Sequence, residues 1–436
     1  ILKGKYCKTK EVRYNMNTIK LQDFPADAVQ GQVYEIIPDK SKVVSSTNRL
    51  FNKYPTRYIS AVPRYAIKNF SDIGDTILDP FCGSGTTAIE AMLLGRNALS
   101  VDIDPFARLL ISVKTEEYKI EDFKLIDRVV NGLKTAKSSD LKRHWVPQIQ
   151  NIEKWFCETS IVQLSFIKWF IDKSCENNGR VKNYLYVVLA GIIRKCSNAD
   201  EVSPKPYIST RYPKIPEIPM EIFFKYEEMY RKAIIEYSEV VSKFNNTSKV
   251  LESNDARIIN VKSNIDAAIT SPPYINAYDY VRSLKFEDMW LGLATDSELR
   301  NNRKSYIGTE SVGSFYNEFI YANQSEILHP IVSEIYAVDA KRAKMVNTYF
   351  EDMSKNLMAV KEALKPGGYY TIVVGDSNIR GQVIPTAKIL QEIAEKNGYT
   401  YQIGFKYLIR DRYLHLPRGN RGGIIKYDEI LVLRKK

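Results

Sequence analysis

A strand, a glycine loop, a helix and a second strand follow one another between residues 75 and 103, and this order limits the fold more than any other feature of the chain. Residues 75–78 and 97–103 have the apolar character of buried strands, and residues 86–94 that of a buried helix. Because the links between them are short, the two strands must be parallel neighbours in one sheet. The chain is therefore predicted to be an α/β protein with a doubly wound sheet.

The composition indicates a protein that meets a polyanion. The chain has 436 residues and a formal net charge of +12 at pH 7. A basic surface of this kind usually contacts nucleic acid, although charge that only maintains solubility is the alternative. The length suits one large domain with insertions or two to three domains. No run reaches the ~18 consecutive apolar residues of a membrane span, so no membrane partner is expected.

The cysteines and histidines argue against a metal site or a disulfide scaffold. The five cysteines form no Cys-x-x-Cys pair, and only three histidines are present. This usage predicts a reducing cytoplasm and no bound metal. The chain starts at Ile1 without an apolar leader, so we expect no signal peptide and a processed or truncated start.

The pattern of elements divides the chain into four parts. Residues 1–47 are a polar N-terminal segment, and residues 48–115 hold the first strands. Residues 116–250 are rich in long helical stretches, which predicts a helical insertion that is either a structural lobe or part of a nucleic-acid cleft. Residues 251–436 resume the sheet, with strands expected at 265–269, 369–374, 401–409 and 429–433.

The glycine loop after the first strand is a candidate cofactor site. Gly83 and Gly85 permit positive φ and a close approach of a ligand to the backbone. The chain lacks Gly-x-Gly-x-x-Gly and a Walker lysine here, which disfavours dinucleotides and nucleoside triphosphates. Asp102 ends the second strand about twenty residues later, where a carboxylate can accept hydrogen bonds from ribose hydroxyls. An ordinary turn or helix cap is the alternative for Asp102.

A second candidate site follows the strand at residues 265–269. Pro272 and Pro273 cannot donate ladder hydrogen bonds, so the strand must stop there, and Tyr274 follows at once. Ligands bind at this end of strands in open α/β sheets. The stretch offers stiff hydroxyl and carbonyl acceptors beside a flat ring, which suits a planar base with an exocyclic amino group. A proline-rich turn without function is the alternative.

Together these motifs resemble those of S-adenosylmethionine-dependent DNA amino-methyltransferases. The run at residues 79–87 is similar to their cofactor loop, Asp102 to their ribose-binding acid, and residues 271–274 to their catalytic motif. Residues 54–58 and 254–256 resemble their segments around the methionine end and the adenine ring. The resemblance covers residues 48–112 and 251–436. It implies S-adenosyl-L-methionine as cofactor and a Rossmann-like sheet, mostly parallel with an antiparallel final strand.

The resemblance also assigns residues to each task. Those assigned to the cofactor are Tyr58, Asp79, Pro80, Phe81, Cys82, Gly83, Ser84, Gly85, Thr86, Thr87, Asp102, Ile103, Asp255, Ala256 and Thr270. Those assigned to catalysis are Ser271, Pro272, Pro273 and Tyr274.

An exocyclic amine is a poor nucleophile because its lone pair is delocalised into the ring. Acceptors at Ser271 and the Pro272 carbonyl would hold both amine hydrogens and free that lone pair. The base must leave the duplex, with Tyr274 as its stacking surface. No cysteine follows a proline, which argues against carbon-5 methylation.

In the family, Ser before the proline pair is typical of N4-cytosine enzymes and Asp or Asn of N6-adenine enzymes. Ser271 therefore favours N4-cytosine, with N6-adenine as the alternative. The same motifs are also compatible with an RNA amino-methyltransferase or with a catalytically silent nucleic-acid-binding subunit.

The expected partner is double-stranded DNA. Arg410, Arg412, Arg418 and Arg421 lie in a basic loop between the last two strands, where they could contact phosphates or guanine edges. A solvated surface loop is the alternative. The family further implies a restriction-modification setting with a cognate restriction endonuclease, and a bacterial-type cytoplasm with association to the nucleoid through DNA. The oligomeric state stays open.

Overall fold

A nine-stranded sheet forms the centre of the computed structural model, which describes residues 18–37, 47–51, 53–201, 203, 205–275, 279–310, 325–409 and 426–436. The strand order is β1-β2-β10-β11-β7-β6-β3-β4-β5. The strands are β1 Thr18–Leu21, β2 Val33–Ile36, β3 Thr76–Asp79, β4 Asn97–Ser100, β5 Ser248–Val250, β6 Ile265–Thr270, β7 Leu364–Gly375, β10 Tyr399–Leu408 and β11 Tyr427–Lys435. A separate hairpin joins β8 Ser377–Ile379 to β9 Gln382–Ile384.

The direction of the strands confirms the predicted α/β sheet. Every neighbouring pair in the nine-stranded sheet is parallel except the two that involve β11, which runs antiparallel to β10 and β7. The first strand and the strand of the second motif are direct neighbours, because Ile77 pairs with Ala267 and Leu78 with Ala268. Both motifs therefore begin at the same edge of the sheet.

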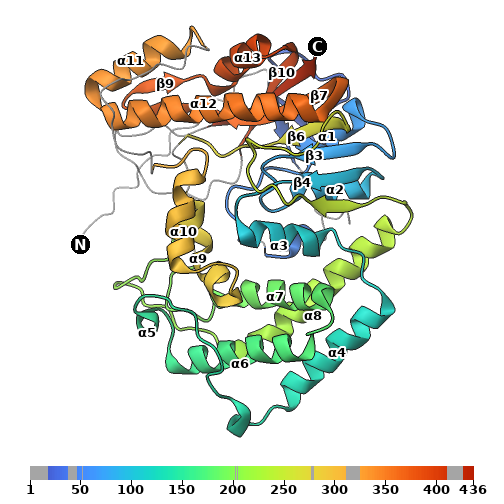
Figure 1. The fold of residues 1–436 in the computed structure, drawn as a ribbon, viewed down its shortest axis with the longest axis vertical. Helices are drawn as coiled ribbons and strands as arrows, with labels where there is room; N and C mark the ends of the chain where they lie inside the picture. The colour runs from blue at the N-terminus through green and yellow to red at the C-terminus, as the bar shows by residue number, and fades with distance from the viewer. Residues whose placement is uncertain are drawn as a thin grey trace, which may run out of the picture.

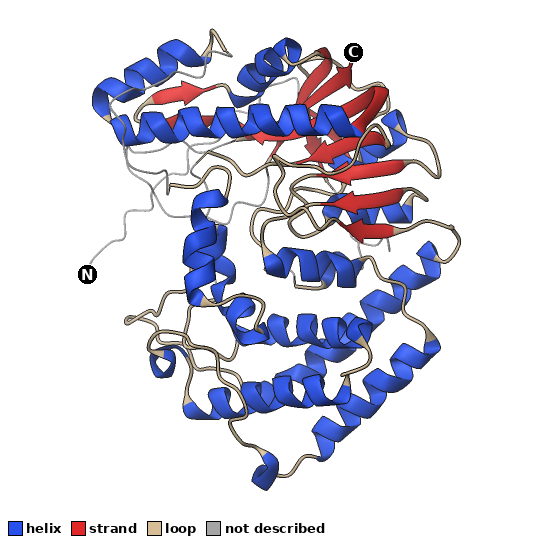
Figure 2. Ribbon diagram, in the orientation of Figure 1, coloured by secondary structure: helices blue, strands red, loops and turns tan. Residues whose placement is uncertain are grey.

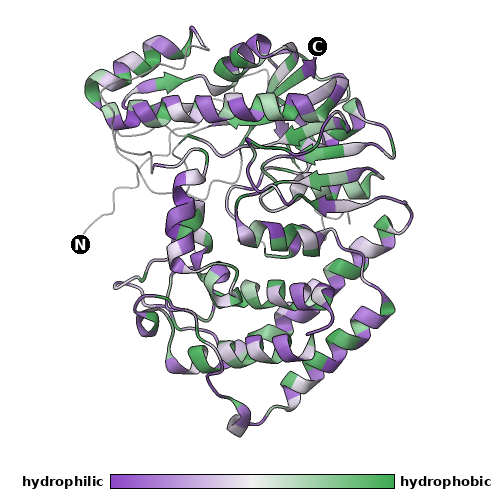
Figure 3. Ribbon diagram, viewed as in Figure 1, coloured by the Kyte–Doolittle hydropathy of each residue, from purple (hydrophilic) through white to green (hydrophobic). Residues whose placement is uncertain are grey.

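Helices cover both faces of the sheet, as the strand side chains require. Successive residues of the strands alternate between two apolar clusters, with Ile77 and Ala267 in one and Leu78 and Ala268 in the other. Figure 3 shows the strands largely in the hydrophobic colour. The helices that cover the sheet are α1 Ala61–Phe70, α2 Thr86–Leu93, α3 Pro105–Lys114, α12 Ala340–Ala363 and α13 Thr386–Lys396, and α11 Leu328–Val338 packs on α12 and β9.

A helical region with its own apolar core lies below the sheet (Figures 1 and 2). It comprises α4 Ile120–Thr135, α5 Ile152–Trp155, α6 Glu158–Ser174, α7 Gly179–Ile193 and α8 Pro219–Val241, with the 3-10 turn η2 Ser138–Asp140. Two further helices, α9 Tyr280–Leu291 and α10 Asp296–Asn302, and the 3-10 turn η3 Arg303–Ser305 follow β6. Helix α9 contacts α3 and α7, so it connects the helical region to the sheet layer.

Some elements differ from the expectations drawn from the sequence. The N-terminal segment supplies β1 and β2, which extend the sheet beyond β10. The strand expected at residues 97–103 ends at Ser100, because the backbone beyond it turns around the carboxylate of Asp102. The strand expected at residues 369–374 begins earlier, at Leu364, and its register against β6 shifts between Leu364 and Tyr369, where Gly367 has φ +76°. No helix in the described parts of the chain has the length and apolar character needed to cross a membrane.

Candidate active site

A cavity with about 760 Å³ of empty space, open to solvent, lies at the carboxyl ends of β3 and β6. We refer to it as the first cavity. The predicted site residues that line it are Tyr58, Pro80, Phe81, Cys82, Gly83, Ser84, Thr86, Asp102, Ile103, Asp255, Ala256, Ser271 and Pro273. The predicted cofactor loop and the predicted catalytic motif thus share one cavity.

Both loop glycines occupy positions that a larger residue would strain. Gly83 has φ +46°, and a Cβ there would lie 3.2 Å from the ring of Tyr54. Gly85 has φ +85°, and a Cβ there would lie 2.9 Å from the side chain of Ile111 on α3. These contacts bring the loop backbone close to α3 and leave its cavity side open to a ligand.

Asp102 joins the loops that follow β3 and β4. Its Oδ2 accepts a hydrogen bond from the backbone N–H of Gly83 at 2.8 Å, and its Oδ1 accepts one from Asp104 at 2.9 Å. Burial raises the pKa of the Asp102 carboxyl above its ordinary value. The hydrogen bonds from the two backbone N–H groups lower that pKa, but by less than burial raises it. The carboxylate is held at the cavity wall with capacity for further donors, such as ribose hydroxyls.

Asp79 lies beneath the first cavity and holds its two motifs together. Its carboxylate accepts hydrogen bonds from the hydroxyl of Thr87 at 2.5 Å and the hydroxyl of Thr270 at 2.6 Å. The hydroxyl of Tyr58 hydrogen-bonds the hydroxyl of Thr87 on α2. Asp79 is buried, and this burial raises its pKa to about 6. Of the predicted cofactor residues, four are outside the cavity lining and support it from below: Asp79, Gly85, Thr87 and Thr270.

Asp255 reaches the cavity from the segment before β6. Arg257 donates to its Oδ2 from Nη2 at 2.7 Å and to the carbonyl of Ser305 at 3.0 Å. Burial would raise the pKa of Asp255, but the hydrogen bonds and charge of Arg257 outweigh it and hold that pKa below its ordinary value. The carboxylate is thus fixed and ionised beside Ala256.

The catalytic motif is divided between the cavity and the sheet. Ser271 and Pro273 line the cavity, whereas Pro272 and Tyr274 do not. The hydroxyl of Tyr274 donates to Asp428 Oδ1 on β11 at 2.6 Å. Asp428 is buried, and burial raises its pKa. The ring of Tyr274 is therefore anchored at its far end.

Sequence reasoning missed a wall of the cavity that comes from residues 280 and 305–307. The hydroxyl of Tyr280 hydrogen-bonds the hydroxyl of Thr56 at 2.5 Å, and that of Tyr306 donates to Asp104 Oδ2 at 3.1 Å. Burial, reinforced by Asp102, raises the pKa of Asp104 to about 7. Neither tyrosine belongs to a motif, so only the folded chain shows that they meet the cofactor loop.

A buried lysine that belongs to no sequence motif also supports the glycine loop. Lys114, at the end of α3, is fully buried and donates from Nζ to the carbonyl of Ser84 at 3.0 Å. Burial lowers its pKa well below the ordinary value. The predicted DNA contacts Arg410, Arg412, Arg418 and Arg421 lie outside the described residues, so they stay predictions.

Comparison with known proteins finds similarity to methyltransferases. The model of the N6_N4_Mtase family, described as DNA methylase, matches residues 2–113. Type II methyltransferase M.MvaI of Kocuria varians is 24% identical over 386 residues, which are 81% of this chain and 82% of the relative. Type II methyltransferase M.BsoBI of Geobacillus stearothermophilus is 23% identical over 401 residues, which are 80% of this chain and 77% of the relative.

Among solved structures, a SAM-dependent methyltransferase from Methanosarcina mazei is 10% identical, with a TM-score of 0.30 over 85% of this chain and 96% of the other. The family-model match and the two Type II methyltransferases support the resemblance to S-adenosylmethionine-dependent DNA amino-methyltransferases that the sequence motifs indicate.

Proposed function

We propose that the chain binds S-adenosyl-L-methionine in the first cavity and transfers its methyl group to N4 of a cytosine extruded from duplex DNA. The observation that carries this proposal is the shared lining: Gly83 and Asp102 line the same cavity as Ser271 and Pro273. A methyl donor and an acceptor base can therefore meet within one enclosure.

The cavity residues fit the cofactor by their chemistry. The glycine backbone at Gly83 admits a close ligand, and Asp102 offers acceptors to ribose hydroxyls. Asp255 is ionised and fixed by Arg257, so it can accept hydrogen bonds from an adenine ring substituent. When bound, S-adenosylmethionine supplies an electrophilic methyl group on a sulfonium.

Ser271 and Pro272 would act on the acceptor amine. The serine hydroxyl and the proline carbonyl accept its two hydrogens, which localises the nitrogen lone pair. As the new N–C bond forms, the methyl–sulfur bond breaks and its electron pair stays on sulfur. One amine proton then leaves toward these acceptors and solvent. The ring of Tyr274 holds the base by stacking, so no covalent nucleophile is required.

The choice of cytosine depends on Ser271, because the family places Asp or Asn there in N6-adenine enzymes. N6-adenine is the second candidate for the same site. The matched relatives are Type II methyltransferases, which supports a restriction-modification setting with a cognate endonuclease for this chain as well. A cytoplasmic location with association to the nucleoid stays a prediction of that setting.

A tritium transfer assay tests the proposal. The protein is incubated with methyl-labelled cofactor and plasmid DNA or total RNA, beside a Tyr274→Ala variant and an exposed control, Lys124→Gln on α4. We expect label in DNA for the wild type and the control. Tyr274→Ala is expected to lose most turnover and keep cofactor affinity, measured by calorimetry. Label only in RNA, or none with any nucleic acid, would contradict the proposal.

A further inference from the structure

A second cavity, with about 480 Å³ of empty space, adjoins the first. The two share Tyr280, Tyr306 and Ile307 as a common wall. Its other lining includes Lys205, from the loop between α7 and α8, and Arg303, from η3 after α10. The helical region and the catalytic half of the chain therefore meet around it. A ligand bound in the first cavity therefore lies next to the second, with these three residues between them.

The acidic groups in the second cavity already have partners. Asp279 Oδ2 accepts from Arg303 Nη2 at 2.7 Å, and its other oxygen caps α9 through the N–H of Arg282 at 3.2 Å. Glu310 pairs with Arg342 at 3.1 Å. Two unpaired carboxylates would make the cavity repel an anion. Because both carboxylates are paired with arginines, this repulsion is largely removed.

Two cationic residues keep donors available. The buried Nε of Arg303 has no acceptor among the described residues, which is costly unless a ligand or water satisfies it. Lys205 is exposed and forms no ion pair with any residue that the structure describes. A guanidinium and an ammonium that line one cavity suit a phosphate group.

Residues 205–212 continue this surface away from the cavity. Tyr207 is 52% exposed and Tyr212 is 72% exposed, with the guanidinium of Arg211 5.4 Å from the centre of the second ring. The backbone is held, since the carbonyl of Tyr207 accepts from the N–H of Asp200 at 2.7 Å. In Figure 1 this light-green segment projects beneath α9 and α10. Exposed rings beside a cation on a fixed backbone suit sugars and unstacked bases.

We propose that the second cavity and residues 205–212 hold the substrate DNA strand beside the extruded nucleotide. Lys205 and Arg303 contact its phosphodiester groups, and the rings of Tyr207 and Tyr212 lie against neighbouring sugars and bases. This inference rests on the proposed function. The second cavity lies beside the extruded nucleotide only if the target base enters the first cavity.

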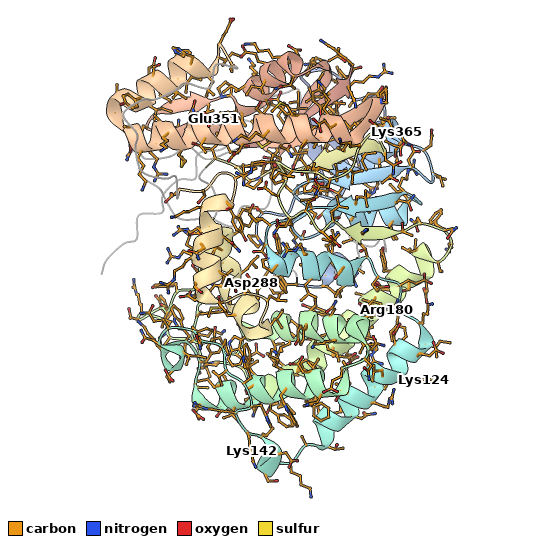
Figure 4. The ribbon with its side chains drawn as sticks, in the orientation of Figure 1. Lys124, Lys142, Arg180, Asp288, Glu351 and Lys365 are labelled. Atoms are coloured by element: carbon orange, nitrogen blue, oxygen red, sulfur yellow. The ribbon has the colours of Figure 1, made fainter. Side chains whose placement is uncertain are left out.

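The test uses salt-dependent binding. A fluorescent fragment is prepared from plasmid DNA that the full-length wild type labels, and its Kd is measured between low and moderate salt. Each lost phosphate contact lowers the slope of log Kd against log salt by about 0.9. We expect this reduction for Lys205→Gln and Arg303→Gln, and none for Lys124→Gln, whose site on α4 lies across the molecule in Figure 4.

The aromatic part has its own readout. Tyr207→Ala and Tyr212→Ala should weaken binding about fivefold or more at every salt concentration while the slope stays that of the wild type. Arg303→Gln also removes the partner of Asp279, which caps α9, so its effect on binding can come from a change in the helix. Lys205 is exposed, so Lys205→Gln decides whether the second cavity contacts phosphates.

A Lys205→Gln slope equal to that of the wild type overturns the inference even if methylation is normal. Stronger competition by single-stranded RNA than by the DNA fragment overturns the choice of partner. If the wild type transfers no label to DNA, the proposed function itself has failed, and this outcome is distinct from the other two.

Discussion

The hydroxyl of Tyr274 donates a 2.6 Å hydrogen bond to the buried carboxylate of Asp428. The two residues are 154 positions apart and belong to a loop after β6 and to β11, the antiparallel strand. Tyr407, near the end of β10, lies beside the same carboxylate. The tyrosine of the predicted catalytic motif is thus oriented by the far half of the sheet.

Removing this bond should impair the chemical step more than binding. Tyr274→Phe keeps the ring and loses the donor, and Asp428→Asn weakens the acceptor. A hydrogen bond to a charged group contributes about 1.5–3 kcal/mol, so we expect kcat to fall roughly tenfold to a hundredfold with KM for the cofactor unchanged.

A double-mutant cycle distinguishes this role from general destabilisation. If the bond acts through ring orientation, the double variant should be no slower than the worse single variant. Fully additive losses in kcat would show that the two residues act independently, and would remove Asp428 from the positioning of Tyr274.

Gly308 supports the catalytic motif from the other side. Its φ is +78°, and an added Cβ would lie 2.9 Å from the carbonyl oxygen of Tyr274. Gly308→Ala must displace that backbone, so we expect methyl transfer to fall at least about tenfold while cofactor affinity is retained.

Gly381 provides the matched control. It has φ +87°, but nothing lies within 4 Å of its virtual Cβ. Gly381→Ala should therefore lose about 1–2 kcal/mol of stability from backbone strain and keep full activity. Equal turnover of both variants would mean that the contact between Gly308 and Tyr274 has no part in catalysis.

Asp79 should make stability depend on pH in a defined window. Its folded-state pKa is about 6, raised from 3.8 chiefly by burial, so the native state holds the proton more tightly than the unfolded state. Its stabilising contribution is complete below about pH 4, falls as pH rises toward 6 and is gone above that value. The whole change is about 3 kcal/mol.

Chemical denaturation of the wild type and Asp79→Asn at pH 4, 5, 6 and 7 measures this effect, because other titrating groups are common to both proteins. The free energy of unfolding of the wild type should decline relative to the variant by up to about 3 kcal/mol. A difference that stays constant, or grows in favour of the wild type, would refute the assignment.

Asp102 should matter for cofactor affinity. Replacement by Ala removes the acceptor of the Gly83 and Asp104 N–H groups as well as the carboxylate at the cavity wall. We expect Kd for S-adenosylmethionine to rise at least about tenfold. Equivalent affinity in calorimetry, with the fold intact by circular dichroism, would exclude it from the cofactor site.

The features predicted correctly from the sequence are local ones. The strand before Asp79, the glycine loop and the proline stop after Thr270 each depend on residues within a few positions, so their pattern is visible in the chain. Their meeting in one cavity follows from the parallel order of β3 and β6. That order does not follow from a short connection, because 191 positions separate Asp79 from Thr270, and it is expected only from the resemblance to the methyltransferase family.

The remainder depends on contacts between distant segments. Tyr280, Tyr306 and Asp428 carry no motif, and they become part of the site only because α9, η3 and β11 pack where they do. The strands β1 and β2 are four residues each, and no long apolar run marks them. A polar edge strand of this length gains its stability from the neighbour with which it pairs, not from its own sequence.

The most direct measurement of the central claim is mass spectrometry of nucleosides from plasmid DNA that the purified protein has methylated with isotope-labelled S-adenosylmethionine. The proposed function, in which the identity of Ser271 selects cytosine, predicts a labelled N4-methylcytosine that disappears in Tyr274→Ala. Labelled N6-methyladenine in its place would contradict the base assignment, and the absence of any labelled DNA nucleoside would contradict the enzyme described above.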